Sequence, residues 1–168
     1  MNNILDRKKA PIVKPIGSFN MPTISEERVH STSLFSYKTD NAPLVRIDVV
    51  FDFGTIDSSK AGILSFYNAI TKDETVQLNH TELNEKIAFY GAAVEVGSSQ
   101  HKTTFTLYSL TKYAERLIPI LFDIISSPSL STERIELLKE KMVQSQLVQE
   151  EKTSFWNSYY FSKAFYKE

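Results

Sequence analysis

The chain has 168 residues, of which 42% are hydrophobic and 12% aromatic, enough apolar material for the core of one globular domain. Its 19 basic and 20 acidic side chains are interleaved and leave a net charge of −1, which excludes a strong electrostatic surface for nucleic acid or an anionic membrane. With no cysteine, the chain forms no disulfide, no thiolate zinc site and no thiol nucleophile.

Two absences bear on localisation. No apolar run approaches 18 residues, so we expect no membrane span. The N-terminus lacks the apolar core of a signal peptide, which favours a bacterial cytoplasmic protein.

The N-terminal part combines a proline-rich segment with two predicted strands. Residues 1–27 contain Pro11, Pro15 and Pro22, and we expect an extended leader strap there. β-Branched and aromatic residues predict strands over Val29–Tyr37 and Leu44–Phe53, separated by a turn signal at Thr39-Asp40-Asn41.

Two helices and two strands follow. A helix over Lys60–Thr71 has candidate N-caps in Asp57-Ser58-Ser59, and a helix over Thr81–Tyr90 has a capping box formed by Asn79 and Glu82. Gly91 is placed to end the second helix. Strands are predicted over Val94–Val96 and Thr103–Ser109.

The C-terminal part is predicted to be helical. A helical stripe consists of Tyr113, Leu117, Ile120, Leu121 and Ile124, and it stops at Ser126-Ser127-Pro128. Ser131 can cap a long polar helix from Thr132 to about Lys152. The order of strands and helices predicts an α+β fold, with an antiparallel or mixed sheet and helices packed on one face.

The most informative stretch is Gly62-Ile63-Leu64-Ser65-Phe66-Tyr67-Asn68-Ala69-Ile70. It resembles the metal helix of the insulinase, pitrilysin and mitochondrial processing peptidase family, where the inverted zinc motif His-x-x-Glu-His lies in the frame Gly-Leu-x-His-Phe-x-Glu-His-Met. The motif positions here are Ser65, Asn68 and Ala69.

Other segments extend the resemblance over roughly residues 28–168. They keep the family's order: Asp52-Phe53-Gly54-Thr55 with Lys60-Ala61-Gly62, Asn79–Gly91, Gly91–Ser99, Thr103–Tyr113, Ser127-Pro128 and Lys139-Glu140-Lys141. In the family, an acidic residue seven positions after the Glu of the last segment is the third zinc ligand, and here that position is Leu147. The resemblance implies that residues 28–168 are the front portion of a peptidase-like α+β domain, truncated relative to the family length.

The family chemistry needs two imidazoles, a third carboxylate ligand and a Glu that takes a proton from zinc-bound water. Ser65, Asn68, Ala69 and Leu147 supply none of these groups, so we expect no catalytic residue, no metal and no cofactor. His30, His80 and His101 are dispersed and lack ligand spacing. Two alternatives remain: a plain buried amphipathic helix, and a metallopeptidase with relocated ligands.

Family members bind extended peptides by adding them to the edge strand beside the metal helix. The matching strand consists of Ala92, Ala93, Val94, Glu95, Val96, Gly97 and Ser98. Glu95 stands where the family has Asn, and Gly97 weakens the strand.

The leading hypothesis is therefore a catalytically inactive homologue that forms a heterodimer with an active zinc peptidase of the family and helps to bind its peptide substrate. The alternative is a structural assembly subunit with no peptide role. Seven aromatic rings lie between Phe155 and Tyr166, and we expect them to be covered by another chain, by a second copy, or by residues beyond the chain.

Overall fold

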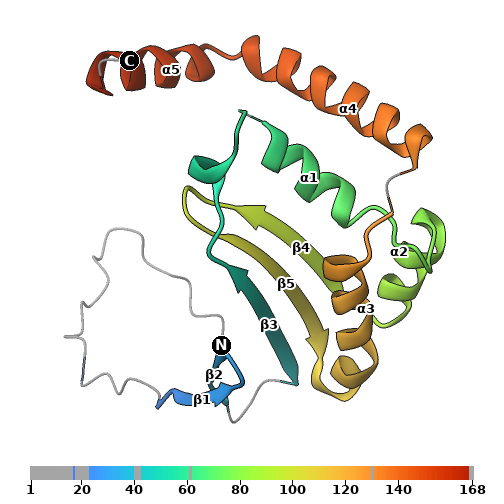
Figure 1. The fold of residues 1–168 in the computed structure, drawn as a ribbon. Coiled ribbons are helices and arrows are strands. Elements are labelled where there is room, and N and C mark those ends of the chain that lie inside the picture. The colour runs from blue at the N-terminus through green and yellow to red at the C-terminus, as the bar shows by residue number, and fades with distance from the viewer. Residues whose placement is uncertain (1–16, 18–22, 40–42, 61, 130, 167–168) are drawn as a thin grey trace, which may run out of the picture. The chain divides into compact units, whose positions relative to one another are not determined.

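The computed structural model describes residues 17, 23–39, 43–60, 62–129 and 131–166 (Figure 1). Contacts divide the chain into two units, residues 1–41 and 42–168. Most of the predicted leader, residues 1–16 and 18–22, lies outside the described residues, as do Asp40 and Asn41 of the predicted turn.

The described part of the first unit is an antiparallel hairpin. It consists of β1 (Ser25–Val29) and β2 (Thr32–Ser36), and β1 crosses the predicted boundary at residue 27. The prediction of one strand over Val29–Tyr37 is wrong, because His30 has φ 58° and the chain reverses at His30-Ser31. A positive φ is uncommon for a residue with a side chain, and the propensity pattern carried no sign of it.

The second unit contains a three-stranded antiparallel sheet in the order β3-β5-β4. Its strands are β3 (Leu44–Phe51), β4 (Ala93–Ser98) and β5 (Thr103–Leu110). Side chains alternate between two faces, and one face carries Ile47 and Val49 of β3 with Phe105 and Leu107 of β5. The predicted α+β class with an antiparallel sheet is confirmed.

Three helices belong to the same unit as the sheet: α1 (Ile63–Thr71), α2 (His80–Phe89) and α3 (Ala114–Ser126). The hydrophobic core joins α2, α3 and β5 and consists of Leu83, Phe105, Leu107, Leu117, Ile120, Leu121 and Ile124. The predicted stripe of α3 is confirmed, since four of its residues are buried and Tyr113 packs against them. Short 3-10 helices cover Thr55–Asp57 and Thr111–Tyr113.

The helix caps were predicted correctly for α2 but not for α1. Asn79 Oδ1 accepts from the Glu82 N–H at 3.0 Å, and the Glu82 carboxylate accepts from the Asn79 N–H at 3.1 Å. Helix α1 starts three residues later than predicted, after Gly62 with φ 82°. Asp57 instead accepts from the Gly54 N–H at 2.8 Å and so belongs to the preceding 3-10 turn.

Two further helices form a C-terminal arm, α4 (Thr132–Glu150) and α5 (Thr153–Tyr166). Neither contains a buried residue. They meet at Glu151-Lys152, where the Trp156 indole N–H donates to the Glu150 carbonyl at 2.6 Å. Among the described helices, none has the length and apolar character needed to cross a membrane.

Candidate functional site

Helix α1 presents the three degenerate motif positions in different surroundings. Asn68 is buried, Ala69 is half-buried and Ser65 is exposed. Leu147 lies on α4, is half exposed and belongs to the helix that contacts α1 (Figure 1). The fold therefore brings the two helices that carry these positions into contact. The four positions hold a hydroxyl, an amide and two apolar side chains.

Asn68 is the first donor in a series of hydrogen bonds that joins α1 to the sheet. Its Nδ2 donates to Ser98 Oγ at 2.7 Å, and Ser98 Oγ lies 2.8 Å from Thr103 Oγ1. The Thr103 hydroxyl donates to the Phe53 carbonyl at 2.8 Å, so Ser98 must be the donor to Thr103. The amide at position 68 therefore holds α1 to the end of the β4–β5 hairpin.

These residues do not fit a zinc ion. Zinc in proteins takes imidazole nitrogen, thiolate sulfur or carboxylate oxygen. The amide nitrogen of Asn68 is a donor engaged by Ser98, and Ala69 and Leu147 have no ligand atom. Across residues 23–39, 43–60, 62–129 and 131–166, no three His, Cys, Asp or Glu side chains are grouped as a metal site.

The predicted peptide strand lies at one edge of the described sheet, since β4 pairs only with β5. The Ser99 N–H donates to the Lys102 carbonyl across the hairpin at 2.7 Å. Because hydrogen-bonded positions alternate along an antiparallel strand, the backbone groups of Val94, Val96 and Ser98 point away from β5. These residues offer the hydrogen-bonding groups that an added strand needs.

Both apolar and polar side chains surround this edge of the sheet. A cavity of about 490 Å³ beside it is lined by Ala69 of α1, by Ala92, Ala93 and Val94, and by His80 and Asn84 of α2 among others. Glu95 and Gly97 are exposed, and Glu95 faces away from the hydrophobic core. The Ser98 side chain is already engaged by Asn68.

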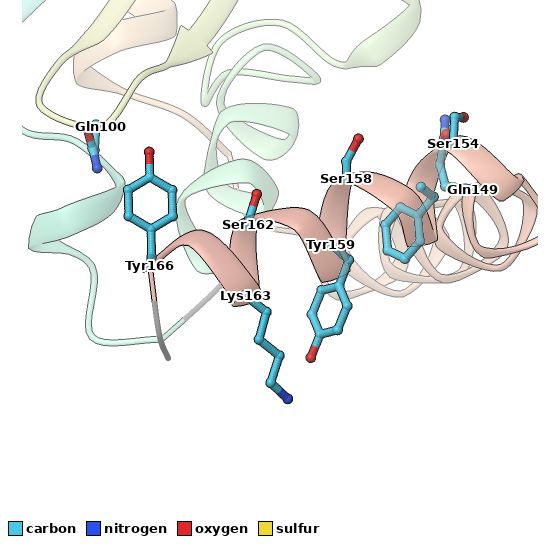
Figure 2. A pocket seen from close by; sticks show the side chains of 9 residues that line it. Gln100, Gln149, Ser154, Ser158, Tyr159, Ser162, Lys163 and Tyr166 are labelled. Atoms are coloured by element: carbon cyan, nitrogen blue, oxygen red, sulfur yellow. The ribbon is translucent and has the colours of Figure 1, made fainter.

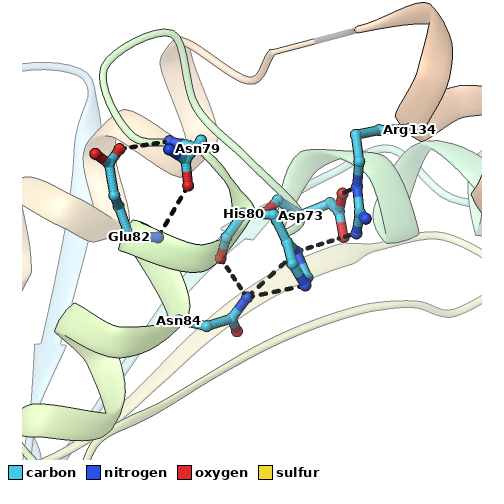
Figure 3. A network of polar contacts seen from close by, with 6 residues as sticks. All are labelled: Asp73, Asn79, His80, Glu82, Asn84 and Arg134. Carbon is cyan, nitrogen blue, oxygen red and sulfur yellow. Dashed lines mark hydrogen bonds and ion pairs between the residues drawn. The ribbon is translucent and has the colours of Figure 1, made fainter.

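A cluster of polar contacts near this cavity was not predicted from the sequence (Figure 3). The buried Asp73 carboxylate receives Arg134 Nε at 2.5 Å and Nη2 at 2.7 Å, and His80 Nδ1 lies 3.0 Å from it. Burial alone would raise the pKa of Asp73, but hydrogen bonds from Arg134 and the His80 and Arg134 charges outweigh it, so the pKa lies below its ordinary value. Asp73 thus joins the end of α1 to the starts of α2 and α4.

The other two histidines are not part of this junction. His30 lies at the turn of the hairpin in the first unit, and His101 is exposed in the turn between β4 and β5. Only His80 of the three has a described ionic partner.

The aromatic helix α5 borders a groove that reaches the β4–β5 turn (Figure 2). Tyr166 points from α5 toward Gln100, while Tyr159 and Lys163 project from the opposite side of the helix. The exposed rings of this helix are Trp156, Tyr159, Tyr160, Phe161, Phe165 and Tyr166. Within the described chain these rings remain exposed, and their cover by another chain or by further residues stays a prediction.

Comparisons with known proteins agree with this geometry. The sequence profile of the family Insulinase (Peptidase family M16) matches residues 34–166. The chain is similar to the inactive domain of an M16 peptidase from Pseudomonas fluorescens, with a TM-score of 0.74 and 13% identity over 83% of this chain and 35% of that chain.

A second solved structure, a protease from Helicobacter pylori, has a TM-score of 0.59 and 16% identity over 77% of this chain and 31% of that chain. The chain therefore spans about a third of the length of the solved structures it matches. No curated protein sequence matches it.

Proposed function

Because this chain belongs to the insulinase family, peptidase family M16, we propose that it is a non-catalytic homologue that acts beside an active peptidase of the family. The observation that carries the proposal is the set of replacements at Ser65, Asn68, Ala69 and Leu147 within a preserved family fold. Asn68 supports it further, because its amide works as a structural tether and has no basic group to accept a proton.

The proposed contribution to peptide binding is the free edge of β4. The outward backbone groups of Val94 and Val96 can extend the sheet by an added strand, the mode known as β-augmentation. A proline at Val96 would remove one outward N–H and leave the pairing with β5 intact. In a reconstituted complex with an active partner, Val96→Pro should lower turnover of an unstructured fluorescent peptide. Unchanged turnover would favour a purely structural subunit.

The proposed partner is a family member with an intact His-x-x-Glu-His motif. Helix α5 supports this, because its exposed rings form a surface of the kind that protein partners cover. Co-purification from the native source should recover such a peptidase. The double variant Phe161→Ser/Phe165→Ser should lose it, whereas Val143→Ser/Val148→Ser on α4 removes similarly exposed apolar groups and should retain it.

Restoring the ligands tests the inactive interpretation directly. The wild-type chain should hold no stoichiometric zinc, measured by metal analysis with mass spectrometry. The variant Ser65→His/Asn68→Glu/Ala69→His/Leu147→Glu should bind zinc, and Ser65→His/Ala69→His alone should bind it more weakly. One zinc per wild-type chain would favour relocated ligands. A folded restored variant without zinc would refute the correspondence of these four positions.

A structural assembly subunit without a peptide role is the second candidate. The exposed rings of α5 favour it equally, because assembly requires a docking surface and no free strand edge. This candidate would be favoured if the Val96→Pro variant still bound its partner and peptide turnover by the complex did not change.

A further inference from the structure

Two cavities border β4, and one lysine lines both of them. The cavity of about 490 Å³ lies at the start of the strand, beside Ala93 and Val94. A second cavity, of about 610 Å³, lies toward the end of β4 and extends over the sheet face that is turned away from the hydrophobic core. Lys72, the residue that follows α1, lines both cavities. A strand added to β4 would therefore pass close to Lys72.

Positive charge predominates in the second cavity. Its charged lining residues are the cations Arg46, Lys72 and Lys102 and the anion Glu95. Arg46 Nε is engaged by Asp48 at 2.9 Å, and Lys102 Nζ lies 3.8 Å from the exposed Asp52 carboxylate. Among the described residues, Lys72 has no ionic partner. A cleft lined mainly by one sign of charge attracts groups of the opposite sign, so this cavity favours an anion.

Gly97 leaves one side of the same cavity without a side chain. It lies on the same face of β4 as Glu95 and pairs with Thr104 of β5, which also lines the cavity. Apart from its chain neighbours, no atom lies within 4 Å of the place that a Cβ atom would take at this position. A glycine inside a strand often marks a site that a ligand approaches closely. The space over Gly97 can therefore accept a side chain from an added strand.

We propose that β4 selects an extended peptide that carries an acidic side chain directly opposite Gly97. This inference rests on the proposed peptide role of the β4 edge. Because the backbone groups of Gly97 point toward β5, an antiparallel peptide residue opposite it forms a non-hydrogen-bonded pair, in which the side chains lie close to the partner strand. The carboxylate would enter the cavity that Lys72 and Lys102 line, where the Thr104 hydroxyl is a further donor.

Glu95 restricts the acidic side chain to one register. A shift of the peptide by one residue would move this side chain to the helix-covered face of the sheet. A shift by two residues would place it opposite Glu95, and like charges at directly opposed positions are destabilising. In an antiparallel strand, the residue opposite Glu95 comes two positions after the residue opposite Gly97. The selected pattern is therefore an acidic residue, any residue and then a residue that is not acidic.

Peptide binding to the full chain tests this pattern. Three host peptides of threonine, serine and valine carry the same dye and contain Glu-x-Lys, Gln-x-Lys or the reversed order Lys-x-Glu, where lysine fits opposite Glu95. Fluorescence anisotropy measures the Kd of each. The Glu-x-Lys peptide should bind about two- to fivefold more tightly than the Gln-x-Lys peptide and more tightly than the reversed peptide. Equal affinities, or tighter binding of the Gln-x-Lys peptide, would overturn the proposal.

Variants of the chain identify the groups that carry the preference. Lys72→Gln should remove most of the advantage of the Glu-x-Lys peptide, and Gly97→Val should reduce it by filling the space over the strand. The control Lys86→Gln removes an exposed cation of α2 that lines neither cavity, and should keep the full advantage. Circular dichroism would verify that each variant is folded. An advantage that survives Lys72→Gln and Gly97→Val unchanged would refute the assigned site.

The variant Val96→Pro separates this inference from the proposed function. It should weaken the binding of all three peptides, because it removes an outward N–H that an added strand needs. If no peptide binds, or if Val96→Pro has no effect on binding, the peptide role of β4 fails and the charge preference fails with it. If Val96→Pro weakens binding but the Glu-x-Lys and Gln-x-Lys peptides bind equally, the peptide role stands and the charge preference alone is refuted.

Discussion

The body of the second unit and its C-terminal arm are stabilised in different ways. In the body, α3 and β5 bury Leu107, Leu117 and Leu121 almost completely. In the arm, α4 and α5 have no buried residue, and α4 is tied to the body by the junction at Asp73. The body therefore relies on apolar burial, whereas the arm buries no residue fully and is joined to the body by the polar contacts at Asp73.

The sharpest test of this difference is a pair of leucine truncations. Leu121→Ala should lower the free energy of unfolding by about 2–5 kcal/mol, because it removes buried methyl groups and leaves a cavity. Leu147→Ala, half exposed on α4, should change it by less than about 0.5 kcal/mol. Urea unfolding measures both. Similar losses in the two variants would show that the arm is packed as tightly as the body.

A smaller effect is expected at the junction. Arg134→Met removes both hydrogen bonds to the buried Asp73 carboxylate and should cost about 1–3 kcal/mol. Amide exchange should accelerate first along α4. The control Lys139→Met breaks an exposed pair with Glu136 on the same helix and should cost less than about 0.5 kcal/mol. Equal losses of unfolding free energy in the two variants would show that the junction stabilises the protein no more than an exposed ion pair does.

The smallest effect concerns pH. The folded-state pKa of Asp73 is lowered, so its stabilising contribution is complete above the unfolded-state pKa, about 4, and is lost as the pH falls through the folded-state pKa. In Arg134→Met, burial still acts on Asp73, and only the contacts with His80 oppose it. The stability gap between wild type and variant should therefore narrow below about pH 4. Urea unfolding between neutral and acidic pH would measure the difference in unfolding free energy. A difference that does not change with pH would contradict the lowered pKa of Asp73.

Features set by neighbours in sequence were predicted well. The capping box of Asn79 and Glu82 and the stripe of α3 depend on spacings of three and four residues, and both are confirmed. The predicted start of α1 was wrong because the Asp57 carboxylate accepts a hydrogen bond from the Gly54 N–H and does not cap α1.

Features that depend on tertiary contact could not be predicted from spacing. Asp73 and Arg134 are 61 residues apart and meet only when α1 and α4 pack together. The four motif positions were assigned by resemblance to the family and stay a prediction, but the partners of Asn68 were not predicted. Ser98 and Thr103 carry no pattern that marks them as neighbours of α1.

The Asn68 tether also opposes a glutamate at position 68. Every proton in the series from Asn68 through Ser98 and Thr103 to the Phe53 carbonyl runs in one direction, and the amide supplies the first. An ionised glutamate has no proton to give, so Ser98 would have to turn its own toward the carboxylate and withdraw it from Thr103. The single change Asn68→Glu therefore breaks a structural contact. A glutamate at position 68 is therefore compatible with this fold only if the contacts of Ser98 and Thr103 change with it.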